Sequence, residues 1–541
     1  MTSIGDNVFE RCTSLENIVI PASVTSIGDN VFCGCTSLKS IVIPASVTSI
    51  GVAAFADCTS LASISVAEGN PTYDSRKKCN AIIETKTNTL LYGCKNTVIP
   101  DGVTSIGVAA FAHCTSLKSI TIPASVTSIG DIVFEGCTSL KSIVIPASVT
   151  SIGDIVFEGC TSLKSIVIPA SVTSIGYDAF AGCTSLESVE IPASVTTIGE
   201  FAFLNCTSLS SVTIYAPELS EYGWRAFENN ASGRKIYVFN KSLATYKAQA
   251  SRMSVDADDI EAITGINLRD NDDNRSLIAA ADGNALGALD VTLKGRTLYK
   301  DGDWNTLCLP FNVTVGSGVM TGATAMTLNG SESGFDASTG VLTLNFVNVA
   351  SSNTIAAGTP FIVKWQKPDG YVAYNPATPE AECSDIVSPV FEGVTVSNAA
   401  TTQTFGNGSF KGTYQSITFT DKNPSILFLG AGNTLYYPES GAKIGAQRAY
   451  FDLGTAQARQ FVLRFVEDPL TEGGNFDGEG TQNGIGHTEI TEITERAGAW
   501  YTLDGVRLDG KPTKRSAEGR LLPTGRKKGL YIHNGRKVVV P

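Results

Sequence analysis

Hydrophobic and polar positions follow a pattern in the first part of the chain that repeats every 23 residues. In one repeat, Ile41 and Ile43 alternate with Ser40 and Val42. This alternation predicts a short β-strand with one buried face. Pro44 has no N–H group for a strand ladder and is expected to end the strand. The pattern therefore predicts a series of similar 23-residue coils, each with a short β-strand, rather than a single sheet.

The period is marked most clearly by cysteine and phenylalanine, each Phe standing three residues before a Cys. Residues 131–153 and 154–176 are identical, which indicates a recent tandem duplication. One turn cannot bury its apolar row alone, so the turns are expected to stack into a solenoid with a continuous core. The repeated cysteines are Cys12, Cys35, Cys58, Cys114, Cys137, Cys160, Cys183 and Cys206.

The motif L-x-x-I-x-I-P-x-x-V-x-x-I-x-x-x-x-F-x-x-C recurs over residues 2–214 and resembles the BspA-like class of bacterial leucine-rich repeats. The resemblance implies a mainly β, leucine-rich-repeat solenoid. It also implies a surface or secreted protein of Bacteroidetes-type bacteria. Several members of the family are implicated in adhesion to host proteins and in co-aggregation, so the resemblance implies adhesion as a function.

We expect the solenoid domain to cover residues 1–264. Residues 67–100 interrupt the period, and two strand-like runs around Lys86-Thr87-Asn88 predict an island β-hairpin there. The period decays over residues 215–264, which we interpret as a cap because a terminal repeat must cover an open apolar end. A helix is expected over 242–250 within this cap.

Residues 265–466 have no repeat. Short strand-like runs alternate there with polar, Gly-rich turns, a pattern typical of an antiparallel β-sandwich. Residues 467–495 carry acidic residues, many Gly and no Lys or Arg, which predicts a linker.

Residues 496–541 are basic and contain Asp504-Gly505 and Asn534-Gly535, two strong hairpin signals. We therefore predict a small C-terminal β-hairpin tail. It resembles the sorting tails of Bacteroidetes secreted proteins, which implies a role in secretion. A stabilising hairpin unit and a site for acidic polymer are the alternatives.

Composition limits the chemistry of the chain. The net charge of −12 argues against nucleic acid as a partner, because phosphate binding needs clustered Lys and Arg. The three histidines, His113, His487 and His533, are too few and too scattered to suggest a zinc site or a catalytic triad. We expect no cofactor, no metal and no enzymatic activity, although the many carboxylates leave a glycosidase open.

The N-terminus begins inside a repeat and shows no signal-peptide pattern. We interpret it as a truncated start, preceded in the natural protein by a signal peptide and further repeats. No apolar run is long enough for a transmembrane segment. The resemblance to the BspA-like class implies a localisation that is secreted or at the cell surface.

The repeated cysteines are expected to form a buried ladder of thiols, each donating its S–H to a backbone carbonyl group. Disulfides between stacked turns and a metal site are the alternatives. Cys33 departs from the ladder and is expected to be an exposed thiol, while Cys79 and Cys94 flank the island hairpin and are a candidate disulfide pair.

The outward strand positions and the lysines beside them form a Ser/Thr/Val surface with a Lys row, which is a candidate docking face for an extracellular protein or glycan. A β-tolerant surface kept uniform by duplication is the alternative. Tyr73 in the island is a candidate aromatic anchor, and a place in the core or cap is the alternative for its side chain. The face comprises Lys39, Ser40, Val42, Lys118, Ser119, Thr121, Lys141, Ser142, Val144, Lys164, Ser165 and Val167.

Three functional hypotheses follow. The first is a non-catalytic binding protein that acts in adhesion through the solenoid face. The second is a carbohydrate-binding or carbohydrate-active protein that uses residues 265–466, where Trp304 and Trp365 are candidates for a sugar-stacking platform or, alternatively, for the core. The third is a structural spacer.

Overall fold

The computed structural model describes residues 1–282, 288–421, 423–430, 433–455, 458 and 460–466, together with short strands between 488 and 540. The chain divides into two compact units. The first comprises Met1–Ile266 and Asp272–Leu289, and the second comprises Asn267–Asn271 and Asp290–Pro541. The fold is mainly β, as the sequence predicts.

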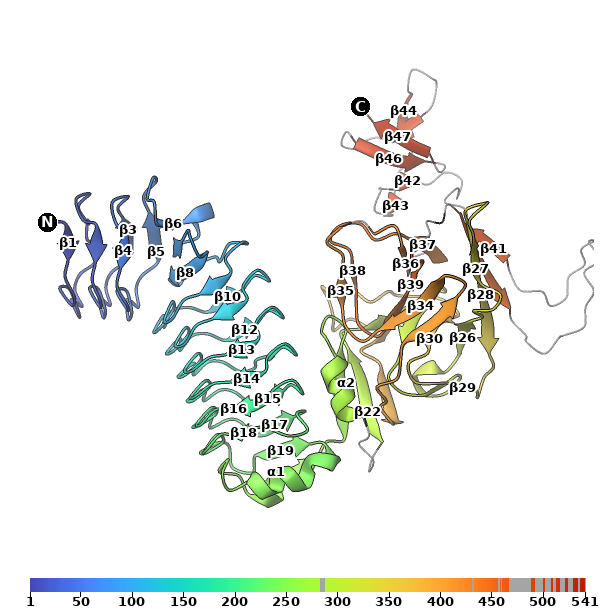
Figure 1. Ribbon diagram of the computed structural model, residues 1–541, viewed down its shortest axis with the longest axis horizontal. Helices are drawn as coiled ribbons and strands as arrows, with labels where there is room; N and C mark the ends of the chain where they lie inside the picture. Colours follow the sequence, from blue (N-terminus) through green and yellow to red (C-terminus); the bar gives the residue numbers. More distant parts are fainter. Residues whose placement is uncertain are drawn as a thin grey trace, which may run out of the picture. The chain divides into compact units, whose positions relative to one another are not determined.

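The first unit is a solenoid whose successive turns lie side by side (Figure 1). Most turns contribute a short Ser-Ile strand that pairs in parallel with the strand 23 residues later, as in Ser3↔Ser26 and Ser151↔Ser174. These strands are β1 (Ser3–Ile4), β2 (Ser26–Ile27), β4 (Ser49–Ile50), β9 (Ser105–Ile106), β11 (Ser128–Ile129), β13 (Ser151–Ile152), β14 (Ser174–Ile175), β16 (Thr197–Ile198) and β18 (Glu221–Tyr222).

A second set of parallel strands carries the alternating Ser-Ile-Val-Ile pattern. Their Ile and Val side chains alternate between the core and the surface, which confirms the period-two prediction. The set comprises β3 (Ser40–Ile43), β5 (Ser63–Val66), β10 (Ser119–Thr121), β12 (Ser142–Val144), β15 (Ser188–Ile191), β17 (Ser211–Ile214), β19 (Lys235–Val238) and β20 (Ile260–Ala262).

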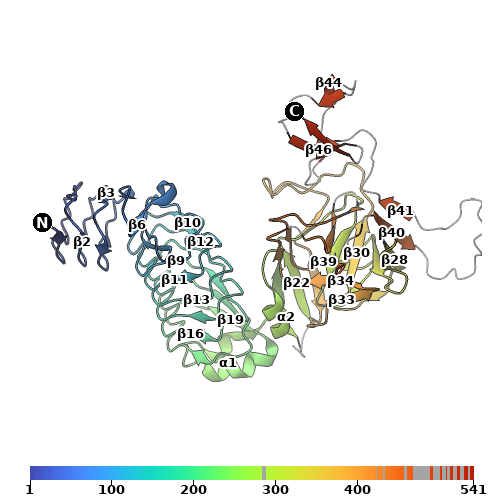
Figure 2. The same ribbon diagram turned by 45° about the horizontal axis from the view of Figure 1, so that its top comes forward.

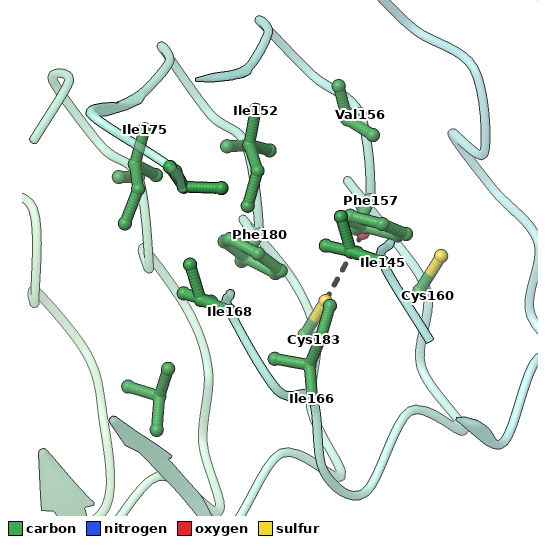
Figure 3. Close-up of a cluster of buried hydrophobic side chains, with 14 of the residues drawn as sticks. Ile145, Ile152, Val156, Phe157, Cys160, Ile166, Ile168, Ile175, Phe180 and Cys183 are labelled. Carbon is green, nitrogen blue, oxygen red and sulfur yellow. Dashed lines mark hydrogen bonds between the residues drawn. The ribbon is translucent and has the colours of Figure 1, made fainter. Parts of the chain in front are cut away.

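The core of the solenoid is a ladder of stacked rings between rows of aliphatic side chains (Figure 3). Phe134, Phe157 and Phe180 are fully buried, and neighbouring rings lie 5.5 and 5.2 Å apart between centroids. Cys183 donates its thiol to the carbonyl oxygen of Phe157 at 3.2 Å, shown as the dashed line in Figure 3. Because every turn repeats these contacts, each turn needs its neighbours to complete its own core.

Where one turn stacks closely on the turn before it, the tight turn after the short strand requires glycine. In Gly176, an added Cβ would lie 2.5 Å from Oδ1 of Asp154 and 2.6 Å from the backbone of Gly153. The same Asp154 carboxylate accepts a hydrogen bond from the N–H of Tyr177 at 2.8 Å. This close approach lets one turn tie down the next.

The island forms the antiparallel hairpin β7 (Ile82–Glu84) and β8 (Thr89–Tyr92), extended by β6 (Tyr73–Asp74). Strand β8 then pairs in parallel with β9, so the island joins the sheet of short strands. Its Tyr92 ring meets Phe55 edge-on at 5.3 Å and takes the place of a ladder phenylalanine. The core is thereby divided into one cluster from Ile4 to Cys94 and another from Cys79 to Ile260.

The C-terminal end of the solenoid is covered by α1 (Leu243–Gln249), in the place where the sequence predicts a helix. Tyr246 points from α1 into the core and donates a hydrogen bond to the carbonyl oxygen of Ala216 at 2.9 Å. Strand β20 adds one more strand to the solenoid beyond β19 through Ile236↔Ile260. Helix α2 (Arg275–Ala281) follows.

The second unit contains two large sheets (Figure 2). A shared cluster of Phe346, Phe410 and Phe451 fills the space between them, as expected for a sandwich. One sheet has the order β24 (Asn305–Cys308), β30 (Pro360–Trp365), β26 (Ala323–Leu328), β28 (Val341–Val349), β40 (Gln460–Val466) and β41 (Thr488–Thr491), with β27 (Gly334–Asp336) beside β28. The other has the order β33 (Thr402–Phe405), β34 (Gly408–Thr413), β39 (Arg448–Asp452), β36 (Ile426–Gly430) and β37 (Thr434–Tyr436).

The pairing in these sheets is antiparallel, as predicted, except that β28 and β40 run in parallel. Smaller sheets complete the unit: β21 (Gly265–Arg269) with β22 (Leu289–Lys294) and β32 (Val390–Val394), β23 (Thr297–Leu298) with β31 (Ile386–Val387), β25 (Val313–Thr314) with β29 (Thr354–Ile355), and β35 (Ile417–Thr418) with β38 (Lys443–Ile444).

Most of the predicted linker, 467–495, lies outside the described residues. Its Thr488–Thr491 segment differs from the prediction, because it forms β41 and pairs with β40. In the tail, β46 (Gly529–His533) and β47 (Arg536–Val540) form an antiparallel pair, and β42 (Trp500–Tyr501) pairs with β43 (Arg507–Leu508) and β46. The predicted turn residues Asp504-Gly505 and Asn534-Gly535 themselves lie outside the described residues. A further pair joins β44 (Pro512–Arg515) and β45 (Leu521–Pro523).

Candidate binding face of the solenoid

The candidate face is formed by the outward positions of the second strand set. Ser119 pairs with Ser142 and Thr121 with Val144, so that like residues of successive turns lie side by side. A further parallel bridge joins Val144 to Val167 and carries the row into the next turn. Because the intervening isoleucines point into the core, these side chains face solvent.

Three lysines border this face on consecutive turns. The N–H of Lys141 donates to the carbonyl oxygen of Lys118 at 3.2 Å, and the N–H of Lys164 donates to that of Lys141 at 3.4 Å. Stacked strands lie roughly 4.8 Å apart, so the three ammonium groups form a dense row of positive charge. All three side chains are exposed, and within the described part of the chain none of them has an ion-pair partner. We call Lys118, Lys141 and Lys164 the lysine row.

Apolar side chains lie beside the lysine row. Val144 is 72% exposed and Val167 is 46% exposed. Ser142 and Ser165 separate them from the lysines and are also exposed. The face therefore presents positive charge, hydroxyl groups and apolar surface in parallel lines.

The structure does not place Lys39 in the same row. Lys39, Ser40 and Val42 lie on the other side of the island, on the smaller core cluster. The Lys39 ammonium lies 2.7 Å from Oε2 of Glu16, and this hydrogen bond lowers the pKa of Glu16. Of these three side chains, Val42 and Lys39 are exposed and Ser40 is half-buried.

The sequence suggested Tyr73 as an aromatic anchor on the surface, but the structure does not place it there. Its ring is buried in the smaller core cluster, and its hydroxyl donates to the carbonyl oxygen of Thr48 at 3.4 Å. The side chains of Asn70 and Ser75 hold the chain on either side of it. Asn70 Oδ1 accepts a hydrogen bond from the N–H of Tyr73, and the Ser75 hydroxyl donates one to the carbonyl oxygen of Ala81. The island is therefore tied into the core by its aromatic residues rather than presenting them.

Trp304 and Trp365 also differ from the sugar-platform hypothesis. Trp304 is buried against Phe465, with ring centroids 5.3 Å apart, and Lys364 Nζ lies 4.5 Å above its ring. Trp365 is buried and its Nε1–H donates to the carbonyl oxygen of Thr321 at 3.1 Å. Both indole rings fill the core, which was the alternative interpretation, so neither can stack on a sugar.

The face continues beyond the lysine row, and there sequence reasoning missed Tyr237. Glu187 follows Lys164 on the next turn, its N–H donating to the Lys164 carbonyl at 3.3 Å. Farther along, the half-exposed Tyr237 pairs with Thr213 on one side and Glu261 on the other. In β19 the aliphatic residues Ile236 and Val238 alternate with Lys235 and Tyr237, and this alternation is the sequence signal that could have identified Tyr237 as an outward residue.

Six of the eight repeated cysteines, namely Cys35, Cys58, Cys137, Cys160, Cys183 and Cys206, form the predicted thiol ladder, whereas Cys12 is exposed and departs from the prediction. The thiols of Cys58, Cys160 and Cys206 donate to the carbonyl oxygens of the phenylalanines 26 residues earlier at 3.1–3.2 Å. Burial raises the pKa of Cys160 and Cys206 to about 12, so these thiols stay protonated.

All thirteen cysteines are free, so the disulfide alternatives are wrong, including the candidate pair Cys79–Cys94. The Cys94 thiol instead donates to the carbonyl oxygen of Asn80 at 3.5 Å. Cys33 is half-buried rather than fully exposed. Among the described residues, no group of three His, Cys, Asp or Glu side chains is arranged to hold a metal ion. In that same part of the chain, no helix has both the length and the hydropathy of a membrane span.

Parts of the chain are similar to several solved leucine-rich structures. A leucine rich cell surface protein of Faecalibacterium prausnitzii A2-165 is 39% identical with a TM-score of 0.36, over 43% of this chain and 61% of that chain. The pneumococcal vaccine antigen PcpA is 21% identical with a TM-score of 0.42, over 48% of this chain and 65% of that chain. A leucine-rich repeat protein of Bacteroides ovatus ATCC 8483 is 28% identical with a TM-score of 0.30, over 48% of this chain and 81% of that chain.

The chain thus spans less than two thirds of the first two of these proteins. No curated protein matches it. The model of the BspA type leucine rich repeat region, in six copies, matches residues 2–84, 83–183 and 127–254. These ranges coincide with the stacked turns, the phenylalanine ladder and the thiol ladder described above, and residues 2–254 are thereby a BspA-type leucine rich repeat region.

Proposed function

We propose that this chain is a non-catalytic binding protein, secreted or held at the cell surface, that acts in adhesion to an extracellular protein or glycan. The family and the Faecalibacterium cell surface protein, a similar structure, support the location. The solenoid offers the binding surface, because its strand face is extended, regular and exposed.

The observation that carries the proposal is the lysine row beside exposed valine. Three ammonium groups on consecutive turns produce a local positive field in a chain of net charge −12. The apolar surface of Val144 and Val167 supplies burial when a partner covers it. A protein surface with carboxylates beside apolar side chains complements this face, and an acidic glycan is the second ligand that it would accept.

The test compares two variants of the full chain with the same loss of charge. The first replaces Lys118, Lys141 and Lys164 by Gln, and the control replaces three exposed lysines away from the face, Lys86, Lys294 and Lys443. Both are tested with the wild-type chain for saturable binding to a panel of matrix proteins and of neutral and acidic glycans, at two salt concentrations.

We expect the lysine-row variant to lose at least tenfold in affinity for its ligand and the control variant to keep the wild-type affinity. Equal losses in the two variants would show that net charge and not this face determines binding. If the wild-type chain bound nothing in the panel, the structural-spacer hypothesis would replace the proposal.

A further inference from the structure

A row of aromatic side chains lies on the edge of the solenoid that follows the short strands. Tyr177, Phe201 and Trp224 occupy neighbouring turns, with ring centroids 5.8 and 5.2 Å apart in edge-to-face contacts. Tyr177 is 43% exposed and Trp224 is 46% exposed, and Phe201 between them is half-buried. We call these three residues the aromatic edge.

The aromatic edge replaces aliphatic and acidic residues of the duplicated repeats. At the corresponding positions the identical turns have Asp131-Ile132 and Asp154-Ile155. Large exposed rings on consecutive turns are costly to leave in water and are the side chains that contribute most to protein interfaces. The edge is thus distinct from the Ser/Thr/Val strand face, where such rings are missing from the central turns.

Carboxylates surround the aromatic edge. Tyr177 hydrogen-bonds to Asp178, which raises the pKa of the phenol, and Glu158 and Glu200 act on it in the same direction. Burial raises the pKa of Glu158, and the neighbouring charges of Asp178 and Glu135 raise it further. These carboxylates repel one another. Few cations are available to neutralise them, because from residue 107 to 224 the only Lys and Arg residues in the sequence are those of the lysine row, on the strand face.

One cation of the chain itself lies against the aromatic edge. The guanidinium of Arg225 lies 4.9 Å from the centroid of the Trp224 ring, within the range of a cation–π contact. Its Nη2 also lies 2.6 Å from Oε1 of Glu228. Ring and carboxylate together therefore bind a guanidinium in this chain itself.

We propose that the aromatic edge is a second interaction surface, which binds an extended arginine- or lysine-rich segment of a partner protein. The rings take the cations by cation–π contacts, and Glu158, Asp178 and Glu200 neutralise them. The ring spacing of 5.2–5.8 Å is close to the distance of about 7 Å between alternate side chains of an extended peptide. An acidic glycan is repelled here, whereas it is accepted at the lysine row.

The experiment uses the full chain and a fluorescein-labelled nona-arginine peptide, with binding followed by fluorescence anisotropy at 50 and 150 mM salt. Replacing Tyr177 and Trp224 by Ser is expected to weaken peptide binding about tenfold. The matched control replaces the exposed Val144 and Val167 of the strand face by Ser and is expected to leave the affinity unchanged. Thermal melting of both variants verifies that they are folded.

A third variant is expected to change the affinity for the peptide in the opposite direction. Arg225→Asn removes the internal cation from the Trp224 ring and frees Glu228, so it is expected to tighten peptide binding two- to threefold. Structural damage would not tighten binding. The proposal is overturned if the Tyr177/Trp224 variant binds the peptide like the wild type, which would mean general charge attraction. It is also overturned if the wild type ignores the peptide but binds a neutral glucose hexasaccharide through these rings.

Discussion

At the scale of single residues, the backbone of the repeated turns enters the left-handed region at two positions, the second residue after the turn glycine and the residue before the repeated cysteine. The second residue after each turn glycine has a positive φ, for example 60° at Asn7 and 52° at Asn30. Asn tolerates this left-handed conformation, but the duplicated turns place Ile132 and Ile155 there, with φ of 65° and 62°. A β-branched side chain pays the highest steric cost in that region.

Ile155→Asn is therefore expected to stabilise the protein, although it removes a half-buried apolar side chain. Relief of left-handed strain is of order 1 kcal/mol or more, and the net gain is expected to be about 0.5 kcal/mol. Urea denaturation of the solenoid transition measures it. Ser142→Asn, at a strand position, is the control and is expected to bring no gain; a loss of stability in Ile155→Asn would show that packing outweighs strain.

The buried thiols give the solenoid a pH dependence. Burial raises the pKa of Cys114, Cys160 and Cys206 from 9.0 to about 12. Below pH 9 both folded and unfolded chains hold these protons, so the contribution is fully present. Above pH 9 the unfolded chain loses them first, and stability falls as pH rises toward 12.

Comparing the free energy of unfolding at pH 8 and pH 10.5 tests this, with Cys160→Ala as the variant. The variant is expected to lose about 1–2 kcal/mol less than the wild type over this interval, because one thiol no longer titrates. Identical losses in both proteins would mean that the ladder thiols are accessible to hydroxide in the folded state.

At the scale of elements, the turns were predictable because each signal is local and repeats. The alternation of apolar and polar residues predicts the strands, and proline predicts where they end. The spacing of Cys and Phe predicts the ladder in the core. The island was harder, since one non-repeating sequence must replace a turn: nothing in the pattern indicates that Tyr92 occupies a phenylalanine position. Tyr73, Trp304 and Trp365 are candidate ligand contacts from the sequence, because the local sequence does not show whether an aromatic side chain in or beside a short strand packs inward or points outward.

Turn glycine gives a prediction with an internal control. In Gly199, an added Cβ would lie 2.4–2.6 Å from backbone atoms of Gly176 and Tyr177. Gly5 holds the same place in the first turn, and the nearest atom there is a Val8 side-chain carbon at 3.9 Å. Gly199→Ala is expected to cost about 2 kcal/mol or more in thermal or urea unfolding, and Gly5→Ala less than about 0.5 kcal/mol. Equal costs would contradict close stacking as the reason for this glycine.

At the scale of the whole solenoid, the island joins two core clusters. The Tyr92 hydroxyl donates to the carbonyl oxygen of Gly51 and accepts from the N–H of Ala54, so a single side chain connects the island to the turn before it. In a stack where each turn contacts only its neighbours, such a joint decides whether both clusters open together.

Tyr92→Phe keeps the ring against Phe55 but removes both hydrogen bonds, and it is expected to lower the stability of the first cluster by about 1–2 kcal/mol. Hydrogen exchange followed by mass spectrometry should show faster exchange in β4 and unchanged exchange in β14 and β16. Tyr73→Phe, which removes one longer hydrogen bond, is expected to have a smaller effect. Uniform acceleration along the solenoid would mean that the two clusters open as one unit.

The identical turns 131–153 and 154–176 have a further consequence. Since each turn pairs with the next in one register, a turn can be gained or lost by recombination between the two copies without changing a single contact type. Each event would lengthen or shorten the face by one lysine, one serine and one exposed valine, a step of roughly 4.8 Å. A bacterial lineage could thus adjust the reach and charge of this surface in whole units, by copy number, with the sequence of the unit left intact.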